Sequence, residues 1–135
     1  MPKFSKKSIE RKNTCVPELQ NILDEIIKYY DFTVIQGHRD KETQNEAYAM
    51  GNSKLSWPNS KHNSYPSEAV DIAPWPIPAG WGDKWKDRVK FYELAALVKY
   101  EAAKQGVNIR WGGDWDSDHD YWDNSFDDLV HFERV

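Results

Sequence analysis

Residues 68–73 read EAVDIA, and this short stretch decides the fold. Small or acidic residues alternate along it with branched aliphatic ones, so that Ala69, Asp71 and Ala73 share one face and Val70 and Ile72 the other. This period of two is typical of a β-strand, which Pro74 would end. An aspartate in so apolar a strand is costly to bury unless it is paired or binds a metal. The stretch therefore predicts a strand that carries one chemically useful carboxylate.

Helices and strands alternate on both sides of this strand. Apolar spacing and residue composition predict helices at 17–30, 41–50 and 87–105 and strands at 32–36, 107–111 and 129–134. Pro17 suits a first helical turn, and Gly106 suits a helix C-cap. Loops at 51–67, 74–82 and 112–128 join the elements. The order predicts a small α+β domain with helices packed on a mostly antiparallel sheet.

Composition excludes several classes of protein. The 135 residues fit one domain, 1–135, which can bury a core without disulfides, and Cys15 is the single cysteine. The basic N-terminus has no apolar segment behind it, so we expect no signal peptide and synthesis in the cytoplasm. No apolar run reaches the ~20 residues of a membrane span, and no basic stripe indicates nucleic-acid binding. We expect a monomer without membrane insertion.

Two of the four histidines stand in contexts that suggest a metal site. His62 precedes the strand of Asp71, and His131 lies in the final strand. Two histidines and a carboxylate meet the need of a hydrolytic zinc ion for three protein ligands and one open position. No H-E-x-x-H motif occurs, which excludes a helix-borne site. Taken alone the set is weak evidence, since His62 could be a polar loop residue and His131 a hydrogen-bonded strand histidine.

Three blocks of sequence, in a fixed order, support the prediction of a metal site. Ser60-x-His62 with residues 66–74 (PSEAVDIAP) is followed by residues 111–115 (WGGDW) and residues 128–133 (DLVHFE). Together they resemble the zinc D,D-carboxypeptidase and L-alanyl-D-glutamate endopeptidase family. That family includes vancomycin-resistance carboxypeptidases and phage endolysins. The resemblance runs from about residue 17 to 135 and implies the fold shared by the hedgehog signalling domain and these DD-peptidases.

The resemblance also implies roles for individual residues. It makes His62, Asp71 and His131 the zinc ligands and Asp128 the catalytic acid/base. Because neighbouring residues of a strand point to opposite faces, only one of Asp128 and its rival Asp127 can face the metal.

On the substrate side, the resemblance makes Arg39 the arginine that faces the substrate, with Gln44 five residues later, and Ser60 a substrate or supporting contact. Two departures stand out. Eight residues separate His62 from Asp71 where six are usual, and Asp40 replaces a usual Ser or Thr.

The implied function is hydrolysis of peptidoglycan stem peptides in the bacterial cell wall. An L-alanyl-D-glutamate endopeptidase of the phage endolysin type fits best, because endolysin members place Asp where carboxypeptidases place Glu. Such an enzyme would be made in the host cytoplasm and would reach the wall after the membrane is permeabilised. Two alternatives stay open: a D-alanyl-D-alanine carboxypeptidase, and a non-catalytic calcium- or wall-binding module.

The loop at 112–128 suggests a second metal. Residues 111–135 carry a net charge of −7, whereas the rest of the chain carries +3. Aspartates recur at alternate positions of the loop, as oxygen ligands do in calcium-binding loops: Asp114, Asp116, Asp118, Asp120 and Asp123. No Gly stands at the sixth position and no Glu at the twelfth, so a solvated acidic loop is an equal alternative.

Overall fold

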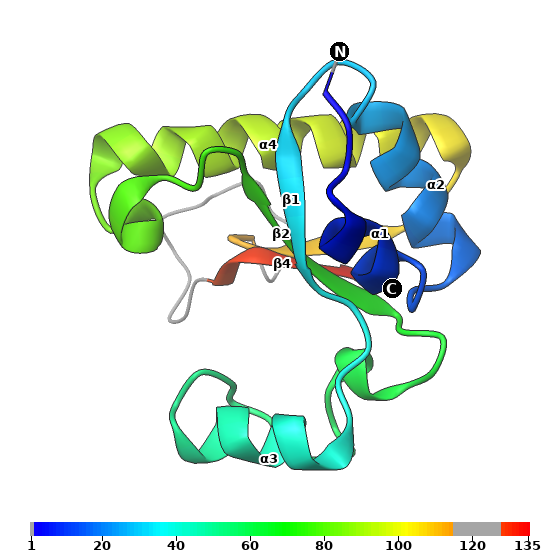
Figure 1. The fold of residues 1–135 in the computed structure, drawn as a ribbon, viewed down its shortest axis with the longest axis vertical. Helices are drawn as coiled ribbons and strands as arrows, with labels where there is room; N and C mark the ends of the chain where they lie inside the picture. The colour runs from blue at the N-terminus through cyan, green and yellow to red at the C-terminus, as the bar shows by residue number, and fades with distance from the viewer. Residues whose placement is uncertain (1, 115–127) are drawn as a thin grey trace.

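The computed structural model describes residues 2–114 and 128–135 and has the expected α+β architecture (Figure 1). Its helices are α1 (Lys6–Lys12), α2 (Pro17–Ile26), α3 (Lys41–Ala49) and α4 (Trp85–Gln105), with short 3₁₀ turns η1 (Lys61–Asn63) and η2 (Ala79–Gly82). Its strands are β1 (Phe32–Gln36), β2 (Ala69–Pro74), β3 (Ile109–Gly112) and β4 (Asp128–Arg134). The strands form one antiparallel sheet in the order β1-β2-β4-β3.

The core lies between this sheet and two helices. Helix α4 packs against β2, β3 and α2, and α1 packs against β1. Val70 and Ile72 of β2 are almost fully buried in this core with Phe132 of β4. Gly106 ends α4 in the left-handed conformation that its C-cap position favours. Strand β2 is central and buried along its whole length, so Asp71 is enclosed by protein on the face opposite the core.

Helix α3 lies apart from this core, on the far side of the sheet from α4 (Figure 1). The segments that follow it, residues 50–60 and η1, return toward β2 and carry His62. The chain after α3 therefore brings His62 to Asp71 of β2, with 3.2 Å between His62 Nε2 and Asp71 Oδ1.

Helix α1 was not expected from the sequence. Its seven residues are mostly basic and lack an apolar stripe. Contacts with β1 hold it: the buried Ser8 hydroxyl accepts from the backbone N–H of Val34 at 3.0 Å, and Arg11 donates to the Val34 carbonyl at 3.1 Å. Periodicity cannot reveal such tertiary contacts.

Among the described residues, no helix is long and apolar enough to cross a membrane.

Candidate metal centre

His62, Asp71 and His131 meet on the face of the sheet opposite the core. Asp71 and His131 are register partners on β2 and β4, and η1 brings His62 over them. The Nε2 atom of His62, Oδ1 of Asp71 and Nδ1 of His131 form a triangle in which every side is 3.2 Å. All three side chains are buried. The structure thus brings together the three residues that the sequence singled out as ligands.

The triangle has the size that a small divalent cation needs. Ligand atoms about 2.0–2.1 Å from a tetrahedral zinc ion lie about 3.3 Å from one another. The three ligand atoms here all lie within 4.8 Å of one another, and each belongs to a residue type that binds zinc. The donor set therefore fits a metal ion held by three protein ligands.

Hydrogen bonds behind the ligands orient both imidazole rings. His62 Nδ1 lies 2.7 Å from the carbonyl oxygen of Gly37, so this nitrogen carries the proton and Nε2 is left to bind. His131 Nε2 lies 2.8 Å from Oε1 of Glu133, which leaves Nδ1 as the ligand atom. Arg110 in turn donates to Oε2 of Glu133 at 2.7 Å. These contacts set the opposite tautomers that the triangle requires.

These supporting residues were not predicted from the sequence. Glu133 could have been found, because it stands two positions after His131 and side chains two apart in a strand share a face. Gly37 carries no such signal. A Cβ atom there would lie 2.2 Å from Thr14 Oγ1 and 2.4 Å from the Arg11 carbonyl, so only glycine fits between α1 and the end of β1.

Charges in the centre shift several pKa values. Burial favours the neutral form of Asp71, but the charges and hydrogen bonds of His62 and His131 outweigh it and hold the pKa of Asp71 far below its usual range. Burial likewise opposes charge on His131, yet hydrogen bonds to Asp71 and Glu133 raise its pKa to about 9. For Glu133, hydrogen bonds from His131 and Arg110 overcome burial and lower the pKa to about 2. Without a metal, the centre is thus a network of ion pairs.

An open cavity of about 620 Å³ lies over the triangle. Asp128, the first residue of β4, lines it together with the three ligands, Arg39 and Leu55. Burial, followed by the negative charge of Asp71, raises the pKa of Asp128 to about 6, against the opposing charges of His131, His62 and Arg39. A carboxyl group with a pKa of about 6 therefore faces the same space as the three candidate metal ligands.

The whole chain, residues 1–135, matches the family model described as phage L-alanyl-D-glutamate peptidase. The chain belongs to this family. Among its relatives is the L-alanyl-D-glutamate peptidase of Escherichia phage T5, 31% identical over 123 residues, which are 90% of this chain and 87% of the relative. The crystal structure of the Serratia marcescens L-Ala D-Glu endopeptidase ChiX superposes with a TM-score of 0.71 at 25% identity, covering 98% of this chain and 89% of that one.

Within this phage peptidase fold, Arg39 is held on three sides. It donates to Gln36 Oε1 at 3.2 Å, to Gln44 Oε1 at 2.9 Å and to Asp71 Oδ2 at 3.4 Å. Gln44 is fully buried and also donates to the Leu55 carbonyl at 2.5 Å. Gln44 therefore holds the arginine and the chain after α3 in place, instead of opening onto the cavity.

Two further polar residues also serve the backbone around the peptidase centre. Ser60 caps η1, because its hydroxyl accepts from the backbone N–H of His62 at 3.2 Å while it also lines the cavity. Asp40 caps α3 by accepting from the Thr43 N–H at 2.8 Å. Ser, Thr and Asp are all good N-caps, which explains why Asp40 can replace the usual residue. The longer spacing between His62 and Asp71 includes an exposed loop at 64–66.

Of the aspartates in the loop at 112–128, only Asp114 and Asp128 are among the described residues. Asp114 is buried, and Lys99 of α4 lies 3.2 Å from its Oδ2. The other proposed calcium ligands lie outside the described residues: Asp116, Asp118, Asp120 and Asp123. Asp127, the rival of Asp128, lies outside them as well.

Proposed function

We propose that this chain is a zinc-dependent endopeptidase that cuts the L-alanyl-D-glutamate bond in peptidoglycan stem peptides. One observation carries the proposal: the three-ligand triangle and the Asp128 carboxyl group face one cavity. The family and the relatives from phage T5 and Serratia marcescens carry this bond in their names. They favour this reading over a D-alanyl-D-alanine carboxypeptidase or a non-catalytic module.

His62, Asp71 and His131 would hold the zinc ion through Nε2, Oδ1 and Nδ1. A zinc ion with three protein ligands supplies Lewis acidity, which polarises a carbonyl group and lowers the pKa of water. The outer contacts of Gly37 and Glu133 keep the rings turned toward the ion.

Asp128 is the group that we assign to proton transfer. Its carboxylate would accept a proton from the attacking water and deliver it to the leaving amine of D-glutamate. A pKa of about 6 suits both steps, because the group can take up and release a proton near neutral pH. Asp128 lines the cavity. Because neighbouring residues of a strand point to opposite faces, this position supports Asp128 rather than Asp127 as the acid/base.

Arg39 is the group that we assign to anion binding. Its guanidinium group is oriented by Gln36 and Gln44, and it lines the cavity beside Asp71. A fixed guanidinium can stabilise the developing oxyanion or bind a carboxylate of the stem peptide. The contact with Asp71 also gives Arg39 a structural role. Kinetics of Arg39→Lys with substrates of different charge would distinguish anion binding from this structural role.

We further propose an endolysin role and a calcium site. The phage origin of the T5 relative supports the endolysin role. In this role the chain would be made in the host cytoplasm and would act as a monomer on the host wall after the membrane is permeabilised. The alternating aspartates of the loop at 112–128 support calcium binding, although Asp114 is paired with Lys99. Calorimetric titration of calcium into zinc-loaded protein, with Asp118→Asn as a variant and magnesium as a control, tests this site.

Purified peptidoglycan treated with zinc-loaded protein tests the main proposal. New N-terminal D-glutamate is the expected product, and free D-alanine would instead identify a carboxypeptidase. Asp128→Asn should keep about one zinc ion and lose activity by about 10²–10⁴-fold, the range of a lost general base. Zinc bound by the wild type without any new amine would contradict the assignment as a peptidase.

A further inference from the structure

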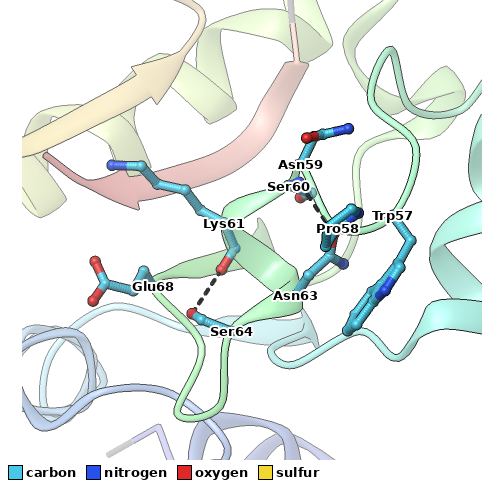
Figure 2. A pocket seen from close by; sticks show the side chains of 8 residues that line it. All are labelled: Trp57, Pro58, Asn59, Ser60, Lys61, Asn63, Ser64 and Glu68. Carbon is cyan, nitrogen blue, oxygen red and sulfur yellow. Dashed lines mark hydrogen bonds between the residues drawn. The ribbon is translucent and has the colours of Figure 1, made fainter.

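A second pocket of about 470 Å³ adjoins the metal cavity (Figure 2). The two share the wall made by residues 59–61. Figure 2 shows Trp57 and Glu68 at opposite ends of this pocket, with Asn63 and Ser64 between them. The second pocket is therefore a direct neighbour of the metal cavity.

The charges that line this pocket are neutralised within the protein. Glu68 is bound by Arg134, with contacts of 2.6 and 3.3 Å. Lys61 donates to the Arg134 carbonyl and lies 3.8 Å from Glu133. Neither charge is available to pair with a ligand at low cost, so the pocket suits a neutral polar molecule better than an acidic peptide.

Two polar groups and one aromatic face remain for a ligand. Asn63 and Ser64 already bond to backbone and side-chain oxygens: Asn63 to Arg39 and Gln44, and Ser64 to Lys61 and Pro66. The side chain of Asn59 and the indole N–H of Trp57, by contrast, make no hydrogen bond to any described residue. Trp57 is only partly buried and offers a flat apolar ring with a polar edge. An indole face and a free amide that line the same pocket match a sugar ring that carries hydroxyl and acetamido groups.

We propose that this pocket is a saccharide subsite that binds the N-acetylmuramoyl residue to which the stem peptide is attached. This inference rests on the proposed function and specifies its substrate. L-Alanine is the first stem residue, so the L-alanyl-D-glutamate bond lies one residue, about 3.5 Å of extended chain, from the sugar linkage. The terminal D-alanyl-D-alanine bond lies about 14 Å away. A sugar pocket that shares a wall with the metal cavity therefore favours cleavage near the glycan.

Two peptide substrates that differ only at the N-terminus test the subsite by cleavage. Both contain the sequence L-Ala-D-Glu. In one, the N-terminal amine of L-alanine is joined by an amide bond to N-acetylmuramic acid, and in the other it carries an acetyl group. We expect kcat/KM to be about tenfold higher for the muramoyl substrate. Trp57→Ala should bring this ratio close to one, whereas Trp75→Ala should leave it unchanged. Trp75 is a matched control, because it is 55% exposed and precedes a cis proline as Trp57 does. It directly follows the last residue of β2.

Binding without cleavage gives a second readout. Titration of the wild type with the methyl glycoside of N-acetylmuramic acid N-methylamide, whose neutral amide stands for the link to L-alanine, should shift the indole N–H resonance of Trp57 more than that of Trp75. If neither peptide is cut but Trp57 shifts, the proposed function is wrong and the subsite stands. If both peptides are cut with equal efficiency, or if the resonance of Trp57 does not move, the subsite is refuted and the peptidase assignment stands.

Discussion

Asp71 and His131 are cross-strand register partners whose ligand atoms lie 3.2 Å apart. The sheet itself thus sets the distance between two of the three proposed ligands, and only His62, in the 3₁₀ turn η1, lies outside it. Ligands carried by paired strands are held more rigidly than ligands on loops. We therefore expect the centre to keep its geometry when the metal is removed.

The first prediction concerns the ligand His131. His131→Ala removes one of three ligands, and after dialysis the zinc content should fall from about one ion per chain to near zero. Inductively coupled plasma mass spectrometry measures this directly, with circular dichroism to check the fold. His38→Ala is the control, because His38 lies outside the triangle and bonds to the Ser64 carbonyl. A full equivalent of zinc in His131→Ala would show that the triangle is not the metal site.

The second prediction concerns Glu133 as a positioning residue. Glu133→Gln weakens the acceptor of the His131 Nε2–H bond, so zinc affinity should fall about 10–100-fold. Competition with a chromogenic chelator measures this affinity without reference to activity. Glu46→Gln, on the exposed side of α3, is the control and should bind zinc like the wild type. Equal affinity in both variants would leave Glu133 with a role in packing alone.

The third prediction concerns the close approach at Gly37. Gly37→Ala forces a Cβ atom against Thr14 Oγ1 and the Arg11 carbonyl, and such overpacking should destabilise the fold by about 1–3 kcal/mol. The displaced Gly37 carbonyl should also loosen its bond to His62, so zinc affinity should drop as well. Urea unfolding and chelator competition measure the two effects. An alanine variant as stable as the wild type would mean that α1 moves away freely.

The fourth prediction concerns pH and the metal-free protein. The pKa of His131 rises from its ordinary 6.5 to about 9 in the fold, so its charged form stabilises the metal-free protein. This contribution is complete below pH 6.5 and is lost as pH rises to 9, where Tm should be lower by roughly 5 °C. Zinc requires a neutral His131, so the gain in Tm on adding zinc should grow over the same range.

Differential scanning fluorimetry with chelator or zinc at pH 6.5, 8 and 9 checks this expectation. His131→Gln cannot titrate there, and its metal-free Tm should change little between these pH values. A metal-free wild type whose Tm is constant or rises from pH 6.5 to 9 would contradict the raised pKa of His131.

The amino-acid sequence by itself predicted most of the helices and strands of this protein and singled out the three residues that we propose as metal ligands. Period-two and helical patterns are local, so β2 and α4 were predicted to within two residues. The costly Asp71 in an apolar strand marked the centre, because burial of an isolated carboxylate needs a partner.

Only the tertiary structure decided how these residues are supported. The bond from His62 to the Gly37 carbonyl, the burial of Gln44 behind Arg39, the docking of α1 on β1 and the pocket at Trp57 all join segments distant in sequence. Such contacts depend on the distances that folding creates between elements, and no local periodicity records them.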